Sequence, residues 1–300
     1  MENILTSVVP AWFFPIVASA ILLGFYDIGK KKSVNENSVM PALFFATLSG
    51  FLFLFTVTLI QGKSGIFFSQ SAIFHLHIFG KAALVASSWI CIYYAMRELP
   101  VSIASPIRAS SPIWTLFGAI LLYGEIPSAW QGAAMFLIFT GYYIFSLIGK
   151  MEGIHFTRSR GIGLILLGTL IGAFSALYDK YLLGVLHYER EPLQFWFSAY
   201  LIIVLGLAWG IRVCFGHKHP FSWRWWIPLT GILLILADWL YFYAVSVPDS
   251  QIAILSLVRR SNCIVSFAIG GIWFHDKNLK QKTIPLFLIL LGVLLLAIKK

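Results

Sequence analysis

Charged side chains inside long apolar stretches are the residues of this sequence best suited to binding or proton chemistry. Arg108, Asp238, Arg259 and Arg260 each lie in such a stretch. An ionisable group at membrane depth costs about 2.5–3.5 kcal/mol on insertion scales, so it usually faces a partner or a water-filled cavity. An arginine in a cavity can bind a carboxylate or a phosphate through two parallel hydrogen bonds. These four residues are therefore our first candidates for a binding site.

Asp238 and Arg259 flank a turn near Pro248 at similar distances along the chain. At a rise of 1.5 Å per residue, each lies about 15 Å from that turn, so the two should reach similar depth on neighbouring antiparallel helices. We expect an ion pair between them, which either opens on binding a proton or an anion, or only locks the two helices together. Arg260 is one position further and points about 100° away, toward a cavity.

Arg108 lacks the acidic partner expected for Arg259. In the first half of the chain, the place of Asp238 is taken by Ser88, because 238 − 88 = 150 is close to the spacing between the two halves. Three roles therefore remain open for Arg108. It can pair with Asp27, extend to the membrane interface, or bind an anionic group of a ligand.

Aromatic residues and two prolines accompany these charges. An aromatic wall suits amphipathic ligands through stacking and cation–π contacts, although interfacial girdles also account for many membrane aromatics. Pro106 and Pro112 lie six residues apart in one apolar segment and predict a kink, either beside a binding site or without any function. The aromatic residues expected to line a cavity are Trp89, Tyr94, Trp239 and Tyr243.

The composition is that of a membrane protein. Hydrophobic residues make up 59% of the chain, charged residues 11%, and the mean hydropathy is +0.84. Soluble globular proteins contain about 25% charged residues. A span of the hydrocarbon layer needs about 20 apolar residues. Segments of that kind lie at 10–29, 40–60, 76–96, 102–123, 128–148, 161–183, 192–212, 226–246, 250–273 and 282–298.

The two halves of the chain share a pattern with a displacement of 151 residues. Arg259 follows Arg108 by 259 − 108 = 151, and Asp276 follows Glu125 by 276 − 125 = 151. Each half contains five segments, an odd number, so the second half enters the membrane from the opposite side. The sequence predicts an all-α integral membrane protein of ten transmembrane helices, arranged as two inverted five-helix repeats around a central cavity. The repeats are expected at residues 1–150 and 151–300.

The matched stretches resemble the drug/metabolite transporter superfamily, in its ten-helix EamA-type branch. The resemblance rests on the run from Pro106 to Trp114 with Gly124-Glu125, and on its copy from Val258 to Ser261 with Asp276. It implies transport of a small metabolite, such as an amino acid, a nucleotide sugar, a sugar phosphate or a drug. The pair Arg259-Arg260 is also similar to the Lys-Arg pair of sugar-phosphate translocators in this superfamily, which favours an anionic substrate.

The function expected from these features is secondary transport of a small amino acid-like or anionic metabolite by alternating access. The alternative is a lipid-carrier or sugar-phosphate type flippase or exchanger of the same fold. Transport can be coupled to protons or to a counter-substrate, and Asp238 is the best coupling candidate. No enzyme activity and no cofactor are expected, since neither a Walker motif nor a cluster of catalytic residues is present.

The expected partners follow from the same composition. Basic residues are spread along the chain, which argues against nucleic acid, and neither the histidines nor the three cysteines have metal-site spacing. We expect a multi-pass protein of the bacterial inner membrane, surrounded by lipid, as a monomer or homodimer. Both termini should lie on one side: the Lys and Arg distribution places them outside, whereas the family resemblance implies the cytoplasm.

Overall fold

The chain folds into a bundle of apolar helices, several of which are long enough to span a membrane. The computed structural model describes residues 10–34, 37–67, 70–98, 108, 110–150, 160–216, 220–248, 250–262, 264–265 and 279–296. Because a backbone in lipid has no water to bond with, every spanning segment satisfies its own N–H and C=O groups as a helix. The helices are α2 Phe13–Val34, α3 Val39–Ile60, α4 Ala72–Glu98, α6 Ser111–Tyr123, α7 Ala129–Lys150, α8 Arg160–Lys180, α9 Arg190–Cys214, α10 Trp226–Ser246, α11 Ile252–Arg260 and α13 Leu279–Leu296.

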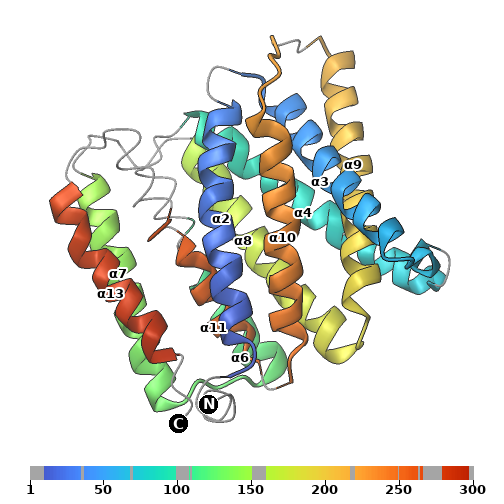
Figure 1. Cartoon of the computed structure of the whole chain (residues 1–300). Coiled ribbons are helices and arrows are strands. Elements are labelled where there is room, and N and C mark those ends of the chain that lie inside the picture. The colour runs from blue at the N-terminus through green and yellow to red at the C-terminus, as the bar shows by residue number, and fades with distance from the viewer. Residues whose placement is uncertain are drawn as a thin grey trace.

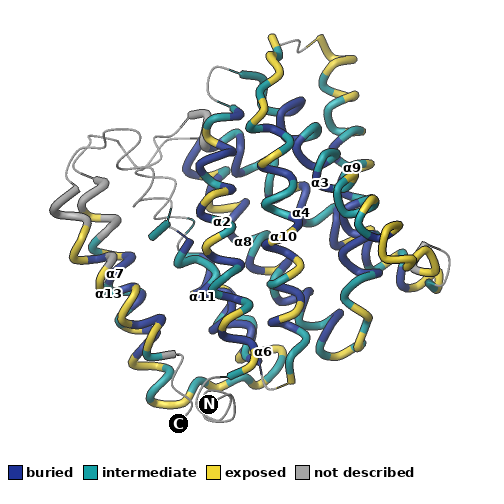
Figure 2. The backbone as a smooth tube through the Cα atoms, viewed as in Figure 1, coloured by how far each residue is buried: buried dark blue, intermediate teal, exposed yellow. Residues whose placement is uncertain are grey.

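Each of the ten predicted segments contains a helix within its described residues. Among the described residues, six helices are long and apolar enough to cross a membrane, and α6 and Thr283–Leu295 are shorter apolar helices. Their outer faces carry exposed large apolar side chains such as Leu121 and Ile60, as contact with acyl chains requires. Figure 2 shows the buried residues concentrated on the helix faces turned toward the centre of the bundle.

The contacts between helices repeat when the two halves are exchanged. Helix α2 packs against α10, and its counterpart α8 packs against α4, the counterpart of α10. Equivalent helices also pair with each other, as α3 with α9, α6 with α11 and α7 with α13. Helix α2 begins at the end of the bundle where α13 ends and runs away from it, whereas α8 runs toward that end (Figure 1). The fold is thus the inverted pair of five-helix repeats predicted from the sequence.

The ends of α6 are set by a proline and a glycine. Pro112 lies in the first turn of α6, where its missing N–H removes no helical hydrogen bond. Gly124 ends the helix with a φ of 63°, and its N–H bonds to Ile120 O at 3.1 Å. The kink predicted from Pro106 and Pro112 stays a prediction, because Pro106 and most of this segment before Ser110 lie outside the described residues.

Close helix packing in the interior depends on small residues. A Cβ on Gly231 of α10 would lie 1.8 Å from Ala46 O of α3, and one on Gly168 of α8 would lie 2.9 Å from Ser88 O of α4. Hydroxyls bridge the same layers: Ser19 donates to Ala237 O at 2.7 Å, and Ser88 donates to Gly168 O at 2.6 Å. These contacts join helices from different halves and enclose the polar interior described next.

Candidate functional site

A cavity of about 180 Å³ lies at the centre of the bundle, between helices of both halves. This volume has room for about a dozen water molecules. Its wall holds five basic and three acidic side chains, so it carries two positive charges in excess when all are ionised. The charged residues of the wall are Asp27, Lys30, Lys81, Arg108, Asp179, Asp238, Arg259 and Arg260.

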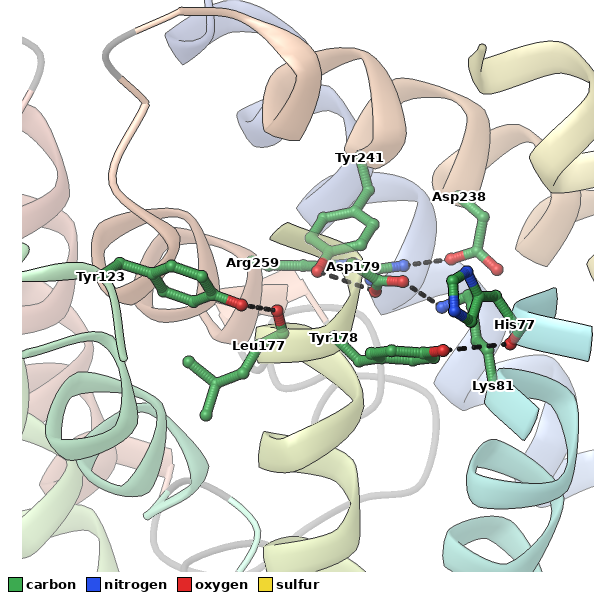
Figure 3. A network of polar contacts seen from close by, with 9 residues as sticks. All are labelled: His77, Lys81, Tyr123, Leu177, Tyr178, Asp179, Asp238, Tyr241 and Arg259. Carbon is green, nitrogen blue, oxygen red and sulfur yellow. Dashed lines mark hydrogen bonds and ion pairs between the residues drawn. The ribbon is translucent and has the colours of Figure 1, made fainter. Parts of the chain in front are cut away.

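Asp238 and Arg259 form the ion pair that their spacing predicted. Asp238 lies on α10 and the Arg259 guanidinium on α11, and both line the cavity (Figure 3). The guanidinium carbon also lies 4.0 Å from the ring centroid of Tyr241, within cation–π distance. The pair therefore satisfies one of the two neighbouring arginines of α11 with partners from α10.

A second buried ion pair, which sequence reasoning did not identify, connects Lys81 of α4 with Asp179 of α8. Tyr241 donates a hydrogen bond to the other carboxylate oxygen of Asp179 at 3.1 Å. The Lys81 Nζ also lies 4.5 Å from the ring centroid of Phe197 and 5.2 Å from that of Phe242. Lys81 is 2% exposed and Asp179 4% exposed, so this pair is among the most deeply buried charges of the described structure.

A third acidic residue, Asp27, lies on α2, at the other end of the cavity wall. Lys30 pairs with it at 2.9 Å, and Asn262 donates to its second oxygen at 2.7 Å. The hydroxyls of Tyr26 and Tyr93 approach each other at 3.5 Å beside this pair, and both tyrosines line the cavity. Asp27 is thus already neutralised from its own helix.

Arg108 and Arg260 are the cavity cations left without an acidic partner. Within the described residues neither forms an ion pair, and the Nε of Arg108 is buried without a hydrogen-bond partner. Both lie within electrostatic range of Asp27. The carboxylate of Asp27 nevertheless bonds to Lys30 and Asn262, so the Asp27–Arg108 pair that the sequence left open is not formed.

Three of the four predicted aromatic residues lie outside the cavity wall. Trp89 lines it, but Tyr94 lies 4.8 Å from the guanidinium of Arg212 instead. Trp239 is 47% exposed, and Tyr243 is 36% exposed. One residue along a helix turns a side chain by about 100°, so these positions were assigned to the wrong face. The aromatic residues that line the cavity are Tyr26, Trp89, Tyr93, Phe197, Tyr241 and Phe242.

Glu125 closes one end of the bundle by joining three helices. Its carboxylate follows α6, accepts the Ile252 N–H at 2.8 Å at the start of α11, and lies 3.6 Å from the Lys180 Nζ at the end of α8. A carboxylate at a helix N-terminus is favoured by the helix dipole. Lys180 also donates to Ser250 O at 2.5 Å. Burial nevertheless raises the pKa of Glu125, opposed by Lys180 and the Ile252 N–H.

Metal or cofactor ligands are not gathered at this site. Over the described stretches of the chain, no three His, Cys, Asp or Glu side chains lie together as metal ligands. The charges of the cavity are instead arranged as ion pairs plus two further arginines. The two further arginines can bind an anion, and the ion pairs can open when one of their members gains or loses a charge.

Comparison with known proteins agrees with this architecture. Residues 10–147, the first five-helix half, match the EamA-like transporter family. One solved crystal structure, described only as that of a protein, has the same fold, with a TM-score of 0.70 over 95% of this chain and 96% of that chain at 13% identity. No curated protein matches the chain by sequence.

The fold and its polar centre define a multi-pass integral membrane protein with a central cavity between inverted halves. The family match over residues 10–147 confirms the resemblance to EamA-type transporters for the first half of the chain. A match to a transporter family implies a small-molecule substrate and a lipid environment.

Proposed function

We propose that the chain is a secondary transporter that moves a small anionic or amphipathic metabolite by alternating access. One observation carries the proposal: two arginines of the cavity wall, Arg108 and Arg260, form no ion pair with any acid of the described residues. A buried unpaired guanidinium is costly, and an anionic ligand would supply the missing partner. Guanidinium groups bind carboxylate and phosphate with two hydrogen bonds, so either group fits.

Alternating access fits the way the cavity is built. Its wall is shared between α2, α4 and α6 of the first half and α8, α9, α10 and α11 of the second. Rocking one half against the other would expose the cavity to each side in turn. We place the boundary between the halves near residue 150 and the protein in a bacterial inner membrane. The start of α2 and the end of α13 lie at the same end of the bundle (Figure 1), as an even number of spans requires.

A thermal-shift screen of the purified protein tests the substrate class. The panel contains amino acids, nucleosides and phosphorylated metabolites, because a ligand that binds only the folded state raises its apparent stability. We expect carboxylates or phosphates to raise the Tm of the wild type and not that of Arg108→Gln. Arg212→Gln is the matched control, since Arg212 stacks on Tyr94 outside the cavity wall.

Transport itself is tested by uptake of the stabilising compounds into proteoliposomes. Saturable uptake that Arg108→Gln abolishes and Arg212→Gln retains would support the proposal. Stabilisation by neutral compounds alone, or an equal response of Arg108→Gln, would contradict the anionic substrate. Movement of a phospholipid analogue between leaflets, without uptake of any water-soluble compound, would indicate the flippase alternative.

A further inference from the structure

Two ion pairs of the cavity are connected through one tyrosine (Figure 3). The Tyr241 hydroxyl donates to Asp179, which pairs with Lys81, while the Tyr241 ring lies under the Arg259 guanidinium, which pairs with Asp238. A change in the charge of Asp179 therefore alters the hydrogen bond of Tyr241 and the position of the ring against Arg259. None of these groups is one of the two unpaired arginines assigned to the substrate.

The Lys81–Asp179 pair differs from the other pairs of the cavity because it spans the two halves. Lys81 belongs to α4 of the first half and Asp179 to α8 of the second. Asp238 and Arg259 both belong to the second half, and Lys30 pairs with Asp27 within α2. Movement of one half against the other must strain or break the Lys81–Asp179 pair, whereas the other two pairs can move as units.

Burial makes the two charges of the Lys81–Asp179 pair depend on each other. With Lys81 2% exposed and Asp179 4% exposed, either charge alone would be left without solvation or a partner. The groups that face Asp179 are Lys81 from α4, Tyr241 from α10, Arg259 from α11 and, within electrostatic range, Tyr123 from α6. Among the described side chains, the Asp179 carboxylate is the only acidic group found to pair with the Lys81 ammonium.

We propose that Asp179 is the proton-binding site that couples proton movement to the rocking of the two halves. This rests on the proposed transport function. A proton from water on one side binds the Asp179 carboxylate and removes its negative charge, so Lys81 loses its ionic partner and the link between α4 and α8 weakens. After the halves have moved, the proton leaves to the other side and the pair forms again. One proton crosses the membrane in each cycle.

A double variant separates this role from a structural one. Asp179→Asn alone would hold the protein in the state in which the Lys81 charge has no ionic partner, whereas Lys81→Met with Asp179→Asn removes both charges, a change that buried pairs often tolerate. Lys63→Met is the matched control, because Lys63 pairs with Glu191 at the surface, where both side chains are 42% exposed, and its removal breaks an ion pair while keeping every carboxyl group. Thermal unfolding of the three proteins establishes that each is folded.

The first readout needs no substrate. Infrared absorption of protonated carboxyl groups is followed against pH in reconstituted protein, and we expect one titrating carboxyl fewer in the double variant than in the wild type or the surface control. Equal titrations in all three would overturn the proposal. Because this result does not depend on transport, it tests proton binding at Asp179 separately from the proposed function.

The second readout is accumulation of radiolabelled glutamate or glycerol phosphate in proteoliposomes under a pH gradient of either direction. Coupling to one proton allows about tenfold accumulation for each unit of pH gradient, since one pH unit is a tenfold change in proton concentration. We expect accumulation of that order in the wild type and the surface control, and a ratio near one in the double variant. Gradient-driven accumulation in the double variant, or uptake by the wild type that ignores the gradient, would overturn the proposal.

Discussion

The two halves of this protein carry equivalent arginines in different surroundings. Arg259 of the second half pairs with Asp238, while Arg108 of the first half faces the same cavity without an acidic partner among the described residues. The place of Asp238 is taken in the first half by Ser88, which donates its hydroxyl to Gly168 O at 2.6 Å. The same cation therefore occurs in both halves, but among the described residues only Arg259 has a carboxylate beside it.

We infer that Arg259 and Arg108 have different roles, one in holding helices together and the other in binding a ligand. A cation already neutralised by a neighbour holds two helices together and offers little to a ligand. A cation whose partner is missing remains available, and it costs stability in the empty protein. We therefore propose that the cavity combines a structural arginine, Arg259, and a binding arginine, Arg108, at related positions.

The largest expected effect comes from removing each arginine in turn. Arg259→Gln leaves Asp238 buried and unpaired, with its side chain 12% exposed, so we expect a loss of about 3–5 kcal/mol in the free energy of unfolding. Arg108→Gln removes no ion pair, and we expect a change within about 1 kcal/mol. Denaturant unfolding in detergent measures both. Equal losses would mean that the two arginines are not separated as structural and binding residues.

Restoring the missing acid should convert the first half to the arrangement of the second. In Ser88→Asp the new carboxylate would lie in the cavity wall with Arg108 and compete with an anionic ligand. We expect the affinity for the stabilising anion to fall at least about tenfold, which corresponds to about 1.4 kcal/mol. Ser88→Asn is the neutral control of similar size. Calorimetric titration measures both, and similar affinities for the two variants would show that the position of Ser88 does not control Arg108.

The packing between helices provides a smaller contrast between the halves. Gly168 of α8 corresponds to Ile16 of α2, because 168 − 16 = 152, and Ile16 is fully buried. A Cβ at position 168 would lie 2.7 Å from Ile92 Cγ1 and 2.9 Å from Ser88 O, so α4 and α8 would have to move apart. We expect Gly168→Ala to lower the free energy of unfolding by about 1–3 kcal/mol.

Another glycine of α8 is the control for this substitution. A Cβ at Gly163 meets nothing within 4 Å, so Gly163→Ala should be neutral or stabilise slightly. If both substitutions lowered the Tm equally, the close approach at Gly168 would not be the cause of its effect.

Most of the fold could be predicted from the sequence because a bilayer imposes the length of its helices. Ten apolar stretches of about 20 residues gave ten helices, and the displaced charges gave the repeat. The Asp238–Arg259 pair could also be predicted, because both residues lie at similar distances from one turn and so at similar depth in the membrane. Pro112 lies in the first turn of α6, and a proline favours that position as well as a kink, so the sequence did not distinguish the two.

The rest of the site depended on information that the sequence pattern does not carry. The helices are apolar on all sides, so periodicity could not separate the cavity face from the lipid face, and Tyr94 and Tyr243 were chosen over Tyr93 and Tyr241. The Lys81–Asp179 pair joins residues 98 positions apart and requires knowing that α4 packs on α8. A signal was present nonetheless, because Lys81 lies inside an apolar segment.

A repeated dipeptide was a second signal for Asp179, which the sequence analysis did not identify. Tyr26-Asp27 and Tyr178-Asp179 occur 152 residues apart, and both acids line the cavity. The repeat placed them at equivalent positions on α2 and α8, but it gave no partner for either. Asp27 pairs with Lys30 of its own helix, whereas Asp179 pairs with Lys81 of a helix in the other half. Sequence identity between repeats therefore does not predict equivalent pairing.

The smallest expected effect concerns the closed end of the bundle, where Glu125 joins α6, α8 and α11. Its sequence counterpart Asp276 lies outside the described residues. Burial raises the pKa of Glu125 in the folded protein, so the folded state holds this proton more tightly than the unfolded state does. Lowering the pH through the interval between the folded and the unfolded pKa should therefore stabilise the wild type relative to Glu125→Gln, in which this group cannot titrate.

Thermal unfolding of wild type and Glu125→Gln across this pH interval measures the difference, and titrations common to both proteins cancel. We expect it to change by less than about 1 kcal/mol, because the opposing contacts with Lys180 and the Ile252 N–H offset part of the burial cost. A wild type that loses stability relative to the variant as the pH falls would mean that the contacts of Glu125 outweigh its burial. The closed end would then be held together mainly by the charge of Glu125, and protonation would loosen it.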